Sequence, residues 1–180
     1  MGYEGMPRIV IGIDFGTTFN TSQKVPTIFD YGKGKIRWGY EVDDASKSIK
    51  GVKLLLDERQ TYYCGLSKDA ESVLQKMKKS AISASGEYVG MLVAHVKNIL
   101  KRRFGTALQT MDLQFVMTVP AVWSDKAKDA TMQAATLAGI PSAGLFLVSE
   151  PEAAAVYAIQ TIQPNTMTVR FHPEIMPKQF

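Results

Sequence analysis

The order of apolar and polar residues divides the chain into strands and helices. Residues 8–13, 112–119 and 145–148 are short apolar runs rich in β-branched or aromatic side chains, a pattern typical of buried strands. Two more runs, 27–29 and 36–38, flank residues 32–35 and predict a β-hairpin. Asp14 and Pro120 directly follow the first two buried strands and Glu150 lies two positions after the third, so we expect these side chains at one edge of a common sheet.

Helical spacing of apolar residues predicts four helices, over residues 67–80, 88–104, 125–138 and 150–159. Ser67 and Ser124 are candidate N-caps, and Gly105 is a candidate C-terminal stop. The alternation of strand and helix from residue 112 onward predicts parallel strands joined by crossover helices. The expected buried faces are Ala70, Val73, Leu74 and Met77 in the first helix, Leu92, Val96, Ile99 and Leu100 in the second, and Ala127, Ala130, Ala134, Leu137 and Ala138 in the third.

Composition adds limits to this picture. The 180 residues are 46% hydrophobic and 21% charged, which is ordinary for a globular domain. The net charge is +4, but the two basic runs, at 76–79 and 101–103, lie at expected helix ends and have no aromatic residues among them. We therefore do not expect nucleic acid binding.

Cysteine and histidine are too few for a disulfide or metal framework. Cys64 is the single cysteine, and the two histidines are far apart in the sequence. No run has the length of a membrane span, and the first seven residues lack the apolar core of a signal peptide. We expect no membrane contact, and a cytoplasmic location with the nucleus as an alternative.

The end of the first strand carries candidate chemistry. Gly16 allows close approach of a ligand, Thr17 and Thr18 offer amides and hydroxyls to phosphate oxygens, and Asp14 can hold hydrated Mg²⁺. A core strand followed by a glycine turn and a solvated aspartate explains these residues equally well. Residues 19–24 lack the helical pattern of a dinucleotide-binding fold, and residues 32–35 lack the spacing of a P-loop.

Three motifs together resemble a known superfamily. Residues 9–18, 113–125 and 145–155 resemble the first phosphate motif, the Thr-Val-Pro-Ala segment and the first connecting motif of the actin-like ATPases, in the same order. Within that superfamily they are most similar to the 70-kDa heat-shock chaperones of the DnaK type, over residues 8–161. The resemblance implies an α/β, ribonuclease-H-like lobe with a mixed, partly parallel sheet and flanking helices.

The resemblance also implies roles for single residues. Asp14 matches the aspartate that holds Mg²⁺ through water, and Gly16, Thr17 and Thr18 match the phosphate-binding turn. Glu150 matches the glutamate that orients the attacking water, and Lys53 resembles the lysine that reaches the γ-phosphate. Pro120 and Lys128 match the relay to the partner domain, although lysine cannot make the two-pronged contact of the arginine usual there.

Simpler interpretations remain open for these positions. Lys53 also fits a solvent-exposed lysine beside an apolar run, an interpretation that the sequence slightly favours. Glu150 also fits a favourable acid in a first helical turn, where Ser149 and Glu152 predict a capping box. Pro120 also fits a plain strand terminator.

The chain departs from the family in two places. Too few residues separate Thr18 from Val25 to form the two further strands of the main sheet, and the second phosphate loop and the adenosine-binding segment are not found in the sequence. We expect an N-terminal tail at 1–7, an incomplete first lobe at 8–162 with a peripheral subdomain at about 35–105, and a divergent, poorly ordered tail at 163–180.

The resulting hypothesis is a truncated, heat-shock-70-like chaperone ATPase, with ATP and Mg²⁺ bound weakly or not at all and little activity alone. One alternative is a non-enzymatic interaction module that binds co-chaperones or competes with a full-length relative. Another is a metabolite kinase of the same superfamily. We also expect self-association through an open sheet edge, since an unpaired strand is a template for further pairing.

Overall fold

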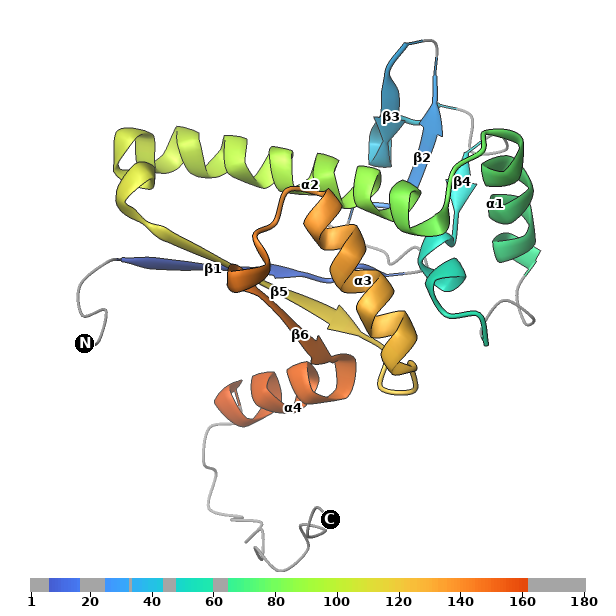
Figure 1. Cartoon of the computed structure of the whole chain (residues 1–180). Coiled ribbons are helices and arrows are strands. Elements are labelled where there is room, and N and C mark those ends of the chain that lie inside the picture. The colour runs from blue at the N-terminus through green and yellow to red at the C-terminus, as the bar shows by residue number, and fades with distance from the viewer. Residues whose placement is uncertain (1–6, 17–24, 33, 44–47, 60–64, 162–180) are drawn as a thin grey trace, which may run out of the picture.

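The structure is a computed structural model that describes residues 7–16, 25–32, 34–43, 48–59 and 65–161. Its main sheet contains β1 (Arg8–Ile13), β5 (Asp112–Val119) and β6 (Leu145–Ser149), in the order β1-β5-β6 (Figure 1). All strands are parallel, with Ile11 opposite Phe115 and Phe115 opposite Leu145. The prediction that these three strands are neighbours in one sheet is confirmed.

A second, antiparallel sheet lies beside the main one. It contains β2 (Ile28–Tyr31), β3 (Ile36–Trp38) and β4 (Ile49–Lys50), in the order β3-β2-β4. The pairing of β2 with β3 confirms the predicted hairpin. Short 3₁₀ helices follow two of these strands, η1 (Gly39–Glu41) after β3 and η2 (Val52–Leu56) after β4.

Four α-helices complete the architecture: α1 (Gly65–Lys76), α2 (Ala81–Phe104), α3 (Asp125–Leu137) and α4 (Glu150–Thr161). Two further 3₁₀ helices, η3 (Gly105–Thr110) and η4 (Ser142–Gly144), precede β5 and β6. Figure 1 shows α2 and α3 on one side of the main sheet and α4 on the other. Burial agrees, because Ile11, Phe115 and Met117 are buried while Val10 and Phe146 are exposed.

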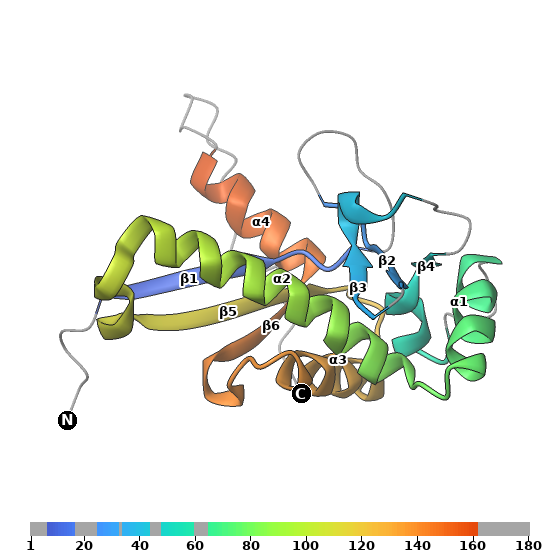
Figure 2. The ribbon, with the colours of Figure 1, turned by 90° about the horizontal axis from the view of Figure 1, so that it is seen from above.

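The long helix α2 packs against both sheets. Seen from above in Figure 2, it runs from the end near α1 across β1 and β5. Its Tyr88 ring lies 5.8 Å from the Phe15 ring after β1, 5.8 Å from Phe29 in β2 and 6.2 Å from Trp38 in β3. The Tyr88 hydroxyl donates to the Pro26 carbonyl at 3.1 Å. One aromatic cluster therefore joins the two sheets into a single core.

Two helix starts differ from the sequence predictions. Helix α1 begins at Gly65, so Ser67 lies inside it, fully buried, and the prediction of an N-cap at Ser67 is wrong. Helix α2 begins at Ala81, seven residues before the predicted start, and the Ser80 hydroxyl caps it by accepting from the Ser83 amide. The predicted stop is confirmed, since Gly105 at φ 57° ends α2.

The predicted faces of α2 and α3 are confirmed except for one exposed residue in each. In α2 the predicted Leu92, Val96 and Leu100 are partly buried against the core, but Ile99 is 43% exposed, and the fully buried positions lie nearer the start of the helix. In α3 the prediction is wrong for Leu137, which is 65% exposed, because Thr131 and Ala135 occupy the buried side. Helices α2 and α3 approach each other closely, since a Cβ on Gly86 would lie only 3.0 Å from the Ala134 carbonyl oxygen.

Within the described residues, β1 pairs only with β5, and β1 and β6 are the edges of the main sheet. Residues 17–24, where the family has further strands, lie outside the described part, as do Thr17 and Thr18 themselves. The expected tails, apart from Pro7, lie outside it too.

Candidate functional site

Lys53 is the most deeply buried charged side chain of the predicted site. It lies in η2, is 1% exposed, and places its Nζ 3.1 Å from Oε1 of Glu150. The same ammonium lies 5.3 Å from the centre of the Trp123 ring and 6.0 Å from that of Phe15. The interpretation of Lys53 as a solvent-exposed lysine is therefore wrong.

Ser149 and Glu152 form the cap at the start of α4, and Glu150 takes no part in it. The predicted capping box is confirmed, because the Ser149 amide donates to Glu152 at 3.0 Å and the Glu152 amide donates to the Ser149 hydroxyl at 3.3 Å. The hydrogen bonds to Ser149 lower the pKa of Glu152 from its ordinary value. Glu150 points instead to Lys53, and its side chain is 48% exposed, so one carboxylate edge remains accessible to solvent.

Asp14 extends from the carboxyl end of β1. The Thr118 hydroxyl of β5 donates to Oδ1 of Asp14 at 3.0 Å, and this hydrogen bond spans 104 positions in the sequence. Gly16 follows and is partly exposed. Phe15, directly after Asp14, reaches the Lys53 ammonium, so the ends of β1, η2 and β6 meet at one edge of the main sheet.

Pro120 and Lys128 lie in the connection that follows β5. The Pro120 carbonyl accepts from the Trp123 amide at 3.2 Å, which forms the turn before α3. Lys128 Nζ lies 3.3 Å from Oδ1 of Asp125 in the first turn of α3. After the Ser149 hydrogen bonds, the charge of Lys128 also helps to lower the pKa of Glu152.

The donor set at this edge fits a nucleotide phosphate with Mg²⁺. The carboxylate of Asp14 suits a hard cation, and the Lys53 ammonium suits a phosphate oxygen. Among the described residues no group of three or more His, Cys, Asp or Glu side chains is placed to hold a metal ion. A single carboxylate fits Mg²⁺, which usually keeps several of its waters.

Three residues at this edge were not predicted from the sequence: Thr118, Trp123 and Asp57. Thr118 binds Asp14, Trp123 covers Lys53, and Asp57 accepts from the Ser124 hydroxyl at 3.4 Å. Thr118 carried a signal, because it lies in the Thr-Val-Pro-Ala segment. The contacts of Trp123 and Asp57 join distant parts of the chain, so nothing in the nearby sequence could predict them.

This architecture, a parallel sheet with flanking helices and a charged site at the strand ends, is that of a partial actin-like ATPase lobe. A family model described as Hsp70 protein matches residues 64–170, more than half of the chain. The chain therefore belongs to the Hsp70 family. The match continues nine residues beyond residue 161, where the motif resemblance was expected to end.

Curated relatives have low to moderate sequence identity. The chaperone protein HscA of Buchnera aphidicola is 25% identical over 189 residues, covering 90% of this chain and 31% of the relative. An HscA homologue of Mannheimia succiniciproducens is 31% identical over 184 residues, covering 83% and 28%, and one of Rickettsia bellii is 27% identical over 171 residues, covering 82% and 28%. The chain thus spans less than a third of the length of these relatives.

The match to the Buchnera protein covers more positions than the chain has residues, so this relative has residues opposite gaps in the chain. Among the helices of the described residues, none has the length and apolar character needed to cross a membrane.

Proposed function

We propose that this chain binds the phosphates of Mg-ATP weakly, at the edge where β1, η2 and β6 meet, and does not hydrolyse ATP at a useful rate alone. The ion pair between the buried Lys53 and the half-exposed Glu150 carries this proposal. Burying a lysine costs free energy that an ion pair with a half-exposed partner compensates only in part. An anion-binding role gives a reason for keeping such a lysine in the core.

Each residue has a separate task in this proposal. Asp14 holds Mg²⁺ through water, while Gly16, Thr17 and Thr18 offer donors to the phosphates. Lys53 neutralises charge on the terminal phosphate, and Glu150 orients a water. Mg-ATP, when bound, supplies the phosphoanhydride bond that hydrolysis would break. The charge of Lys128, which helps to lower the pKa of Glu152 in the first turn of α4, supports the proposed relay role of Lys128.

The limited activity follows from the open site. Actin-like ATPases hold the phosphates between loops from two lobes, and this sequence has no counterpart of the second loop or of the adenosine segment. Charged contacts open to water are weaker than contacts in an enclosed cleft. The relatives' name, chaperone, supports an ancestral role in chaperone-type conformational change with co-chaperones, and we expect a cytoplasmic location.

Calorimetry with Mg-ATP, together with phosphate release, tests the proposal. We expect a dissociation constant weaker than about 100 μM and no turnover above background, with at least about tenfold weaker binding for Asp14→Ala and Lys53→Met. Asp69→Ala in α1 and Lys97→Met in α2 are matched controls, since both residues are exposed and neither was predicted at the site. Micromolar binding with turnover that Asp14→Ala abolishes would overturn the claim of inactivity. Binding that is unchanged in both site variants would overturn the site.

A non-enzymatic interaction module is a second candidate, favoured by exposed apolar side chains. Val10 and Phe146 are exposed on the α4 side of the main sheet, and Val156, Tyr157 and Ile159 are exposed on α4. Grouped exposed apolar residues are typical of interaction surfaces. Nucleotide-independent capture of a full-length relative, reduced by Phe146→Ser, supports this candidate, and a monomer with no such binding speaks against it. The relatives named above are chaperones, so the metabolite kinase is not carried further.

A further inference from the structure

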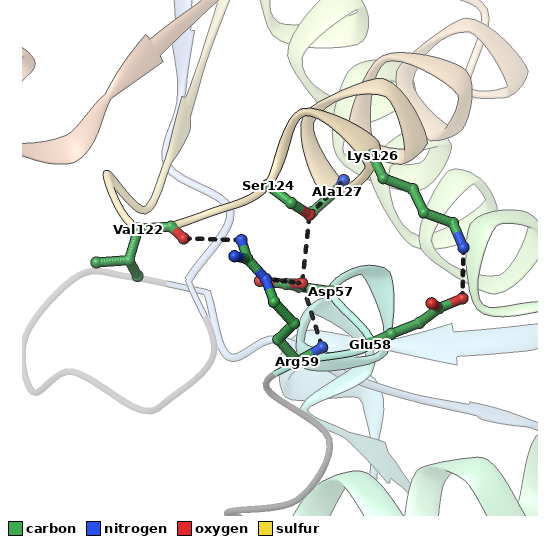
Figure 3. Close-up of polar contacts among 7 residues, drawn as sticks. All are labelled: Asp57, Glu58, Arg59, Val122, Ser124, Lys126 and Ala127. Carbon is green, nitrogen blue, oxygen red and sulfur yellow. Dashed lines mark hydrogen bonds and ion pairs between the residues drawn. The ribbon is translucent and has the colours of Figure 1, made fainter.

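A set of polar contacts ties the residues that follow η2 to the residues on both sides of Trp123. Figure 3 shows Asp57 and Arg59 on one side and Val122 and Ser124 on the other. The Ser124 hydroxyl donates to Oδ1 of Asp57 at 3.4 Å, and Nη2 of Arg59 donates to the Val122 carbonyl at 3.2 Å. We call these two contacts the η2–α3 clasp.

Asp57 connects the two contacts of the clasp, and Ser124 also caps α3. Oδ1 of Asp57 also accepts from the Arg59 amide at 3.3 Å and lies 3.6 Å from Nε of Arg59. The Ser124 hydroxyl, while donating to Asp57, accepts from the Ala127 amide at 3.2 Å and so caps α3. Asp57 is only 2% exposed, so its hydrogen bond with Ser124 is shielded from competing water, whereas the contact between Arg59 and Val122 is exposed.

The clasp brackets the contact between Trp123 and Lys53. Val122 and Ser124 are the neighbours of Trp123, while Asp57 and Arg59 lie four and six positions after Lys53. The buried Trp123 ring lies 5.3 Å from the Lys53 ammonium, which in turn reaches Glu150. The two contacts of the clasp thus lie on both sides of Trp123 in the sequence.

We propose that Asp57 and Arg59 are positioning residues that hold Trp123 against Lys53 and so aim the Lys53 ammonium at the strand-end site. This inference rests on the proposed function in one respect: that function requires the Lys53 ammonium to be positioned to bind a phosphate. The position of the Lys53 side chain can be measured without any nucleotide.

A second pair beside the clasp provides a matched control. Lys126 Nζ lies 2.7 Å from Oε1 of Glu58, joining the same two segments, but both side chains are about three-quarters exposed. Exposed ion pairs contribute little to stability, so Glu58→Gln should leave Lys53 in place. Asp57→Asn keeps an acceptor oxygen for Ser124 and Arg59, whereas Asp57→Ala removes it.

Acetylation of Lys53 in the full chain, followed by mass spectrometry, tests the proposal. In Asp57→Ala we expect Lys53 to react about tenfold faster relative to the exposed Lys101, which corresponds to about 1.4 kcal/mol of local stabilisation. Asp57→Asn should return the rate to within about twofold of the parent, and Glu58→Gln should not change it. Arg59→Met, which breaks the exposed contact with Val122, should raise the rate less than Asp57→Ala does.

Trp123 supplies a second readout. In a Trp38→Phe background Trp123 is the single tryptophan, and its emission should shift to the red in Asp57→Ala but not in Glu58→Gln. Hydrogen exchange of the α2 amides reports global opening. The proposal is overturned if Asp57→Ala leaves Lys53 labelling unchanged, if Asp57→Asn fails to restore it, or if the α2 amides accelerate as much as Lys53. Failure of Mg-ATP binding alone would overturn the proposed function and leave this result standing.

Discussion

Helices α3 and α4 share a local plan but differ in their surroundings. Each follows a parallel strand of the main sheet, each has a serine cap, and each is rich in alanine. Yet α3 buries five residues, and no residue of α4 is buried. The comparison teaches that capping signals determine where a helix begins, while burial depends on what the rest of the chain brings to its surface.

The position of helix α2 explains why α3 is buried and α4 is not. It covers α3 and approaches it closely at Gly86 and Gly90, whereas α4 lies on the opposite side of the sheet, against the ends of β5 and β6 (Figure 1). Alanines are therefore core residues in α3 and surface residues in α4.

The largest expected effect comes from replacing one alanine in each helix by leucine. Ala135→Leu in α3 should lower the free energy of unfolding by about 2–3 kcal/mol, because its site is fully buried and has no space for a larger side chain. Ala155→Leu in α4 should change it by less than about 0.5 kcal/mol, since this residue is exposed. Urea denaturation measures both, and equal losses would contradict the contrast.

The two caps should differ by a smaller amount. Ser124→Ala should cost about 1–2 kcal/mol, because it removes both the cap of α3 and the donor to the buried Asp57. Ser149→Ala removes an exposed cap and should cost about 0.5 kcal/mol. Ser142→Ala, in η4, where no side-chain cap forms, is the control. Chemical denaturation that ranks Ser149 above Ser124 would reverse our interpretation.

The glycines that face α3 test the helix contact itself. Gly90→Ala should stabilise the chain by about 0.5–1 kcal/mol, since its Cβ would lie 3.6 Å from Ala138, an ordinary contact, and alanine favours helix. Gly86→Ala should lower stability by up to about 1 kcal/mol, since its Cβ would crowd the Ala134 carbonyl. Thermal melts of the two variants should shift in opposite directions, and a shift in the same direction would show that α2 and α3 separate easily.

The smallest effect is the pH response of α4. Because the pKa of Glu152 is lowered in the folded chain, mainly by the Ser149 hydrogen bonds, its stabilising effect is complete above the ordinary value of 4.5 and is lost as pH falls through the lowered value. Helix content measured by circular dichroism should therefore decrease slightly below about pH 4.5. The decrease should be smaller in Glu152→Gln, and an identical decrease in both would assign it to other carboxylates.

Local signals predicted much of the fold. The apolar run at residues 112–119 matches β5 at both ends, and Ser124 and Ser149 cap as expected. The first turns of α2 were missed because Ser83, Ser85 and Gly86 show no apolar period, and contact with α3 supports the helix there. Tertiary packing thus outweighed the weak local preference.

The site was predictable by residue type more than by environment. Strand ends correctly indicated where Asp14 and Glu150 lie, but nothing near Lys53 in the sequence revealed its burial. Phe15 and Trp123, which cover it, are 38 and 70 positions away. The roles of Asp14, Lys53 and Glu150 in nucleotide binding remain predictions for the calorimetric test.

The pairing of β1 with β5 has a consequence for biosynthesis. Arg8 pairs with Asp112, so the first strand cannot join its partner until about a hundred further residues have been made. At roughly 5–20 residues per second, translation leaves this apolar segment without its partner for about 5–20 s. Closing such a long loop also slows folding, while α2 and α3 make more local contacts. The nascent chain should therefore be most prone to aggregation in the interval before β5 has been made.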